Sequence, residues 1–224
     1  MIGTPDTEPL IINDYFQALF PMAPDEYDYY LESGWRHYAG HFTRYNFGEY
    51  DGNVYRVLPL RVNLDDWSPS RSQRRVLFKN TDVEASIGFV LITDRVKALF
   101  DEHKRRFTFR PPDSIYDHVH WQGRIPTYTW QLTVQVDGVL KAASFFDCGE
   151  QSISSIYTCF AREENARSLG IYAILKTIEW GKKLGKTYYY PGYAYEEKSF
   201  YDYKKRIGEL EVFDWRGNWS PREF

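Results

Sequence analysis

The 224-residue sequence contains two cysteines, no long apolar run, and no Lys or Arg in its first 35 positions. Cys148 and Cys159 are too few to form a disulfide framework, so a reducing cytoplasm is the expected compartment. No stretch approaches the roughly 18 apolar residues that a membrane span needs. Residues 1–10 lack the basic and apolar regions of a secretory signal. These absences favour a cytoplasmic protein without a membrane partner.

Charge is distributed unevenly along the chain. Seven acidic residues lie in residues 1–35, so the other 189 residues carry 28 basic against 24 acidic side chains, although the formal net charge is −3. For contact with nucleic acid, clustering of charge matters more than the total. Aromatic residues make up 18% of the chain, including 19 Tyr. Tyrosine suits both protein cores and sites that stack on bases, so composition leaves both uses open.

Local patterns in the first half of the chain predict alternating helices and strands. The expected elements are an irregular arm and short helix over 1–33, a strand over 54–62, a helix capped by Ser68 or Ser70 and ending near Lys79, a strand over 83–92, a helix capped by Thr93, and a loop-rich segment over 107–127.

The second half gives a sharper pattern. Asp137-Gly138 predicts a two-residue hairpin turn, since both positions of such a turn need positive φ. The expected elements are strands over 128–136, 139–147 and 152–160, a helix over 168–184, a strand over 187–193, a helix over 197–206 and a strand over 209–214. This order resembles the α+β GNAT acetyltransferase fold, a mixed sheet with flanking helices. We expect residues 1–92 to form a smaller N-terminal α+β region and residues 93–224 the GNAT-like domain.

The start of the 168–184 helix is the first candidate site. A helix N-terminus attracts phosphate, and GNAT acetyltransferases place a (Gln/Arg)-x-x-Gly-x-(Gly/Ala) turn there. Here the run is Arg167 to Tyr172: Gly170 matches, but Tyr172 replaces the last small residue. A tyrosine at that position would crowd a pyrophosphate, which argues against acetyl-CoA and leaves room for another donor. An ordinary helix start at Ser168 is the alternative.

Five stretches in order resemble the arginyl- and leucyl-tRNA–protein transferases of the N-degron pathway. They are Gly34-Trp35-Arg36, the run from Trp67 to Leu77 with its Pro-Ser-Arg-Ser-Gln-Arg-Arg core, Asp147 with Tyr157, Ser168-Leu169-Gly170-Ile171-Tyr172, and Gly192-Tyr193 with Tyr203-Lys204-x-Arg206. Three features depart from the family. Residues 37–66 lack the family's cysteines, Ala161-Arg162-Glu163 replaces Asp-Pro-Asp, and Phe200-Tyr201 replaces Lys-Met.

The resemblance implies transfer of an amino acid of the arginine or leucine class from charged tRNA to the N-terminal amine of an acidic acceptor protein or peptide, without a cofactor. In GNAT-type folds the strands before and after the long helix splay apart, so we expect the cleft between the strands over 152–160 and 187–193. Asp147 would orient or deprotonate the amine. The residues expected to bind the tRNA donor are Arg71, Gln73, Arg74, Arg75, Lys79, Tyr157, Ser168, Leu169, Gly170 and Tyr172. The residues expected to bind the acceptor are Tyr193, Tyr203, Lys204 and Arg206. Within the basic run, Arg71, Arg75 and Lys79 are spaced four apart, which puts them on one helix face.

Other interpretations remain open at this point. The chain is alternatively a CoA-dependent GNAT N-acyltransferase, or a catalytically silent relative that binds tRNA or protein N-termini. His118 and His120 alternate as on a strand, but no third metal ligand is near them in the sequence. We therefore expect no metal site, and we interpret the two cysteines as small buried hydrophobes.

Overall fold

The computed structural model describes residues 9–107 and 111–224. The first eight residues of the predicted arm and residues 108–110 of the predicted loop-rich segment lie outside the described residues. The helices are α1 (Pro24–Glu32), α2 (Arg71–Lys79), α3 (Asp94–Lys104) and α4 (Leu169–Lys183), with 3-10 segments η1 (Ile115–Asp117), η2 (Arg162–Arg167) and η3 (Phe200–Arg206). The strands are β1 (Asp14–Gln17), β2 (Arg36–Tyr38), β3 (His41–Arg44), β4 (Phe47–Tyr50), β5 (Asn53–Asn63), β6 (Glu84–Phe89), β7 (Thr129–Val136), β8 (Val139–Cys148), β9 (Ser152–Phe160), β10 (Tyr188–Tyr195), β11 (Leu210–Phe213) and β12 (Trp219–Arg222).

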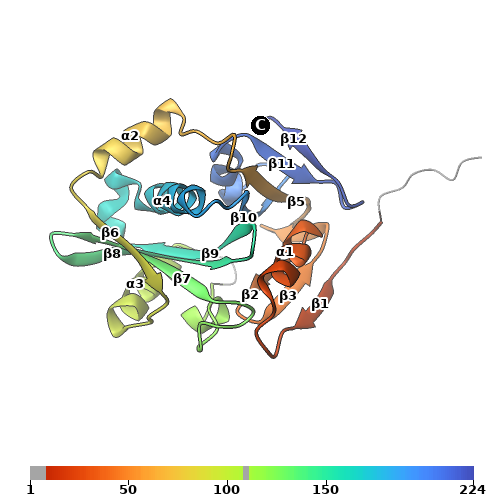
Figure 1. The fold of residues 1–224 in the computed structure, drawn as a ribbon, viewed down its shortest axis with the longest axis horizontal. Helices are drawn as coiled ribbons and strands as arrows, with labels where there is room; N and C mark the ends of the chain where they lie inside the picture. The colour runs from red at the N-terminus through yellow and green to blue at the C-terminus, as the bar shows by residue number, and fades with distance from the viewer. Residues whose placement is uncertain (1–8, 108–110) are drawn as a thin grey trace, which may run out of the picture.

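One large mixed sheet organises the molecule (Figure 1). Its strand order is β12-β11-β5-β10-β9-β8-β7-β6, with β4 paired to β5. The neighbours β9 and β10 run parallel, and the chain between them forms α4. This strand order, with a helix after the third strand of the β7–β9 meander, confirms the predicted GNAT-like α+β fold. Because β5 lies between β10 and β11, the sheet takes strands from both sides of residue 92.

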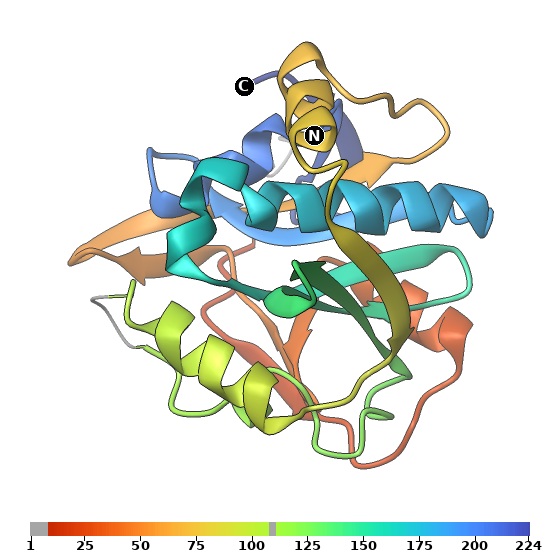
Figure 2. The ribbon, with the colours of Figure 1, turned by 90° about the vertical axis from the view of Figure 1, so that its left-hand side faces the viewer.

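Helices cover the two faces of the sheet, as Figure 2 shows. On one face α4 buries Leu175 and Ile178 against Phe146 of β8. On the other face α3 buries Leu99 and Phe100 against Phe145 of the same strand. Because adjacent residues of a strand face opposite sides, one strand serves both cores. In the described part of the chain, no helix combines the length and apolarity that crossing a membrane would require.

Local sequence signals set most of these boundaries. Asp137 and Gly138 both have positive φ, 51° and 72°, which confirms the hairpin turn between β7 and β8. Ser70 caps α2 through a capping box with Gln73, and Thr93 caps α3. The element expected over residues 197–206 is the 3-10 segment η3 instead of an α-helix.

Residues 14–44 form a small unit that the sequence did not predict in full. The antiparallel strands β1, β3 and β2 make a second, three-stranded sheet that packs with α1. Its core is aromatic, with Tyr27 and Phe42 fully buried. Asp28 on α1 accepts hydrogen bonds from the Gln151 backbone N–H and the Ser152 hydroxyl, which fixes the unit to the β8–β9 turn. This attachment places β2 at the edge of a cavity between β9 and β10.

Candidate active site

A cavity opens where β9 and β10 separate. The two strands pair only at Ser152–Ser154 and Tyr188–Tyr190. Beyond that point β9 has an irregular register with β8 around Ile156, and β10 carries Pro191, which has no N–H to donate. The gap leads into a cavity of about 560 Å³, within the range of small-molecule sites. It lies between the two strands from which a cleft was predicted.

Two cations stand at one end of the cavity. Arg36 of β2 has its guanidinium 4.9, 5.1 and 4.6 Å from the ring centroids of Tyr38, Tyr45 and Tyr193. Lys204 of η3 donates a hydrogen bond of 2.9 Å to the Tyr193 carbonyl oxygen. Burial, together with the nearby Arg36 charge, lowers the pKa of Lys204 to about 7. These two groups make a partly desolvated, cationic surface.

Carboxylates do not balance these cations. Among the described residues that line the cavity there is no Asp or Glu, whereas Arg36, Arg106 and Lys204 all line it. The buried Nε of Arg36 also has no hydrogen-bond partner among the described residues. Two like charges side by side without a counter-ion are unfavourable in a partly buried site. The cavity is therefore suited to an anionic group and unsuited to a cationic one.

The start of α4 forms another wall of the cavity. Ser168 has the left-handed φ of 56° and precedes the first turn, whose N–H groups lack intrahelical partners. Ser168, Gly170 and Ile171 line the cavity. A Cβ on Gly170 would lie 2.9 Å from the ring of Phe160, so only glycine lets the helix approach β9 this closely. The predicted helix start is thus at the cavity, and its donors are available to a ligand.

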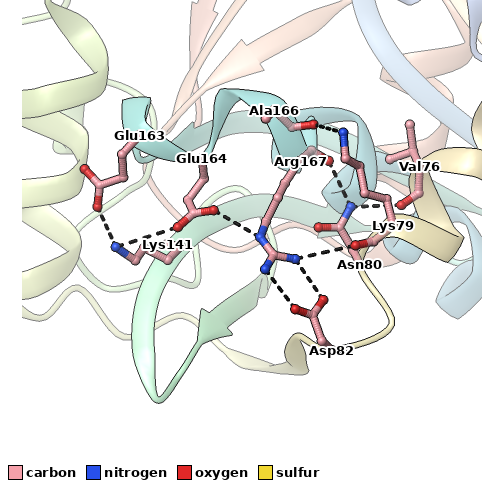
Figure 3. Close-up of polar contacts among 9 residues, drawn as sticks. All are labelled: Val76, Lys79, Asn80, Asp82, Lys141, Glu163, Glu164, Ala166 and Arg167. Atoms are coloured by element: carbon pink, nitrogen blue, oxygen red, sulfur yellow. Dashed lines mark hydrogen bonds and ion pairs between the residues drawn. The ribbon is translucent and has the colours of Figure 1, made fainter.

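Polar contacts fix the segment that leads into α4 (Figure 3). Arg167 forms two 2.8 Å hydrogen bonds with Asp82 and a 3.1 Å ion pair with Glu164. At the end of α2, Lys79 and Asn80 donate to the carbonyl oxygens of Ala166 and Arg167. The basic helix α2 is therefore joined to the cavity wall, and the Arg167 charge is already neutralised by acidic partners.

The structure brings several predicted residues to the cavity. Those that line it are Tyr157, Ser168, Gly170, Tyr193, Tyr203 and Lys204. On α2, Arg71, Arg74, Arg75 and Lys79 are exposed on the surface.

Four predicted residues have other positions. Leu169 and Tyr172 are buried in the core beneath α4, so Tyr172 does not crowd the helix start, and the argument it gave against acetyl-CoA fails. Gln73 is also buried, and its side-chain amide donates to the backbone oxygens of Arg206 and Ile207, which leaves it unavailable to tRNA. Arg206 is exposed outside the cavity wall.

Asp147 also differs from its predicted place. It is 0% exposed and is not part of the cavity wall. Its Oδ2 lies 3.4 Å from Nε2 of His37, a ring that does line the cavity. His37 is held by the Tyr27 hydroxyl, which donates to Nε2, and by its own Nδ1–H, which donates to the Ala39 carbonyl oxygen. Direct contact between Asp147 and an incoming amine is incompatible with this burial.

Burial raises the pKa of Asp147 to about 8, which predicts a pH-dependent stability. The unfolded chain releases this proton near pH 3.9, while the native state keeps it. The native state therefore loses stability as pH rises from about 4 to about 8, by up to about 1.4 kcal/mol per pH unit. Asp147→Asn removes the titration and keeps the shape. The unfolding free energy of the variant minus that of the wild type should grow between pH 5 and pH 8 in urea titrations, and parallel pH profiles would contradict this assignment.

Sequence reasoning missed several residues of the site. The sequence marks Arg36 only as part of a family motif and gives no indication that His37, His103 and Arg106 belong to the site. The signal was weak, because β2 is only three residues long and Arg106 follows the end of α3. His103 lies on the apolar face of α3, where the helical pattern indicates a core residue. The tertiary fold alone brings residues of β2 and α3 to the same cavity as β9.

A mixed sheet whose parallel neighbours splay around a cavity, with a helix start at its wall, defines the GNAT-like fold class. The crystal structure of FemX shares this fold, with a TM-score of 0.52 at 10% identity over 89% of this chain and 69% of FemX. A family model described as arginine-tRNA-protein transferase, C terminus, matches residues 67–214. The chain belongs to this family of aminoacyltransferases, as the sequence motifs predicted.

Curated relatives agree with the family. An aspartate/glutamate leucyltransferase of Xanthomonas oryzae pv. oryzae is 32% identical over 171 residues, covering 71% of this chain and 67% of the relative. An aspartate/glutamate leucyltransferase of Saccharophagus degradans is 30% identical over 185 residues, covering 76% and 78%.

Proposed function

We propose that this chain transfers leucine from charged tRNA to the N-terminal amine of proteins that begin with Asp or Glu, in the cytoplasm. The observation that carries the proposal is the cavity itself: two cations, Arg36 and Lys204, at one end, and no acidic residue among its described lining. An acceptor's side-chain carboxylate would supply the missing negative charge. The family and the names of the relatives supply the reaction type.

The same charge pattern favours leucine over arginine as the transferred group. An arginyl side chain would bring a third or fourth cation into a cavity without a counter-charge, which is costly in a partly buried site. A leucyl side chain needs only apolar contact, and Ile171, Ile174 and Phe160 offer it on the cavity wall. The preference for leucine thus follows from two features of the described cavity lining: it contains no acidic residue, and it offers apolar side chains.

The transfer reaction needs few catalytic groups from the protein. The neutral amine attacks the ester carbonyl carbon, the new C–N bond forms, the C–O bond to the tRNA ribose breaks, and the amine loses a proton as the ribose hydroxyl gains one. An α-amine has a pKa of about 7.7–8.0, so a usable fraction is already neutral. The site must hold the amine and the ester within reach and stabilise the oxyanion. Beyond Ser154 the side of β9 that faces the cavity has no pairing with β10, so its backbone groups are free for this.

The tRNA would approach over α2. Its exposed Arg71, Arg75 and Lys79 lie on the helix that is joined to the α4 start through Lys79 and Asn80 (Figure 3). Phosphates held on this surface would position the acceptor end at the cavity. Because the aminoacyl ester is already activated, we propose that no metal or other cofactor takes part.

A transfer assay with a peptide library tests the proposal. Purified protein is incubated with leucyl-tRNA or arginyl-tRNA and peptides bearing each possible N-terminal residue, with and without a chelator, and products are read by mass spectrometry. We expect leucine on Asp- and Glu-starting peptides, at least tenfold less product from the matched Asn- and Gln-starting peptides, and no effect of the chelator. Equal use of neutral and acidic N-termini would reject the acceptor assignment, and preference for arginyl-tRNA would reject leucine.

A further inference from the structure

Besides the Nε of Arg36, three buried polar atoms of residues on the cavity wall have no hydrogen-bond partner among the described residues. They are the two ring nitrogens of His118 and the hydroxyl oxygen of Tyr157. Both side chains line the cavity, and their rings stack with centroids 4.4 Å apart and planes 20° apart. Buried polar groups are nearly always hydrogen-bonded. A cluster of polar groups without partners in a cavity therefore indicates a ligand that supplies the missing hydrogen bonds.

The fold holds these rings in place. The 3-10 segment η1 is closed by a capping box of Ser114 and Asp117, and His118 follows it directly. The His118 carbonyl oxygen accepts a 2.6 Å hydrogen bond from the Ala39 backbone N–H of the N-terminal unit. Tyr38 packs edge-on against the imidazole at 5.2 Å. The neighbouring His120 has a different role, because its Nδ1 accepts a hydrogen bond from the Gln122 backbone N–H and its ring lies outside the cavity wall.

The electrostatics around His118 and Tyr157 differ from those around Arg36. Burial lowers the pKa of His118 to about 4 and raises the pKa of Tyr157, so both groups are neutral near pH 7. Asp117 acts against the shift of His118, and Arg36 adds to it. A neutral imidazole offers one donor and one acceptor, and a phenol offers both. The matching ligand is uncharged and presents a donor beside an acceptor.

Aromatic rings surround this polar edge. His103, Phe107 and Phe160 line the same cavity, and Tyr157 contacts the ring of His103 at 6.0 Å. Arg106 lies 4.1 Å above the ring centroid of Phe160. Such walls favour a flat, aromatic ligand, as in sites that hold single nucleotides.

We propose that His118 and Tyr157 form a subsite for the adenine base of the tRNA's 3′-terminal adenosine. This inference rests on the proposed function, under which the cavity must hold three groups. The leucyl side chain has no polar atoms, and the acceptor's carboxylate is matched by Arg36 and Lys204. Adenine alone combines a flat ring with an amino donor next to a ring-nitrogen acceptor.

The test measures binding without any transfer. The probe is 3′-amino-3′-deoxyadenosine carrying leucine through a stable amide, compared with the same compound lacking the 6-amino group. His118→Phe keeps a flat ring and removes both nitrogens, and Tyr157→Phe removes only the hydroxyl. His120→Phe is the matched control, and circular dichroism checks the fold of each variant.

We expect His118→Phe to weaken binding of the adenosine probe by about 10- to 100-fold and Tyr157→Phe by about 5- to 20-fold. Each change removes a buried hydrogen bond and leaves the ligand's polar group unpaired. His120→Phe should change binding less than twofold. The probe without the 6-amino group should bind the wild type more weakly than the adenosine probe does. Its affinity should fall only slightly further in His118→Phe.

Equal affinity of wild type, His118→Phe and Tyr157→Phe for the adenosine probe would overturn the subsite and leave buried water as the partner of these atoms. The subsite would also be overturned if His118→Phe weakened binding of the two probes by the same factor. The result is independent of the transfer assay, because a protein that fails to use leucyl-tRNA can still distinguish the two probes, and one that transfers leucine can fail to distinguish them.

Discussion

Replacing Arg36 with Gln should raise the KM for Asp- and Glu-starting peptides by about 100-fold, with tRNA affinity changed less than twofold. The guanidinium lies in a cage of three tyrosine rings with a free Nε, so it is placed to pair with a carboxylate. Hydrogen bonds to charged groups contribute about 1.5–3 kcal/mol each, and removal of one partner leaves the other desolvated. Loss of such binding appears in KM more than in kcat.

Arg44→Gln is the matched control, because Arg44 is a cation on the adjacent β3 that pairs with Asp14 and lies outside the cavity wall. Lys204→Met should act in the same direction as Arg36→Gln. Because burial and Arg36 lower the pKa of Lys204 to about 7, acceptor binding should also weaken as pH rises above 7. If Arg36→Gln raised the KM for Ala-starting peptides equally, Arg36 would maintain the shape of the cavity and would not recognise the acidic side chain.

The triple change Arg71→Ala, Arg75→Ala and Lys79→Ala should weaken tRNA binding and flatten its salt dependence by up to about three units of slope. All three side chains are exposed on α2, at the four-residue spacing of one helix face. Each phosphate contact that is lost removes the release of about one counter-ion. Filter binding between 50 mM and 200 mM salt measures the slope.

Lys79 needs separate treatment, because it also donates to the Ala166 carbonyl oxygen and its loss can disturb the segment before α4. The pair Arg71→Ala and Arg75→Ala isolates the phosphate contribution, with an expected change of up to about two units. Arg95→Ala with Lys97→Ala on α3, on the opposite face of the sheet, is the control. A salt slope equal to that of the wild type in the triple variant would mean that α2 is only a solvated surface.

The sequence predicted the elements from β5 onward well because their signals are local. The Asp137-Gly138 turn, the caps at Ser70 and Thr93, and the apolar face of α4 each depend on neighbouring residues only. The predicted site was less accurate, because a motif says nothing about which side of an element reaches the cavity. Ser168 and Gly170 face the cavity, whereas Leu169 between them enters the core.

The cationic end of the cavity could not be derived from the sequence by physical reasoning. Arg36 and Lys204 come from opposite ends of the chain and meet only because the unit of β1, β2, β3 and α1 is fixed to the β8–β9 turn. Its strands are three or four residues long, too short for a period-two pattern to stand out. The position of Asp147 beside His37 has the same origin, so its burial could not be foreseen.

Direct comparison of two acyl donors distinguishes aminoacyl transfer from CoA-dependent acetylation. The protein is given an Asp-starting peptide with either leucyl-tRNA or acetyl-CoA, and the mass of the peptide is followed. We expect leucyl-tRNA to add one leucine to the peptide's N-terminus and acetyl-CoA to add nothing. Acetylation of the peptide without any use of leucyl-tRNA would contradict this expectation.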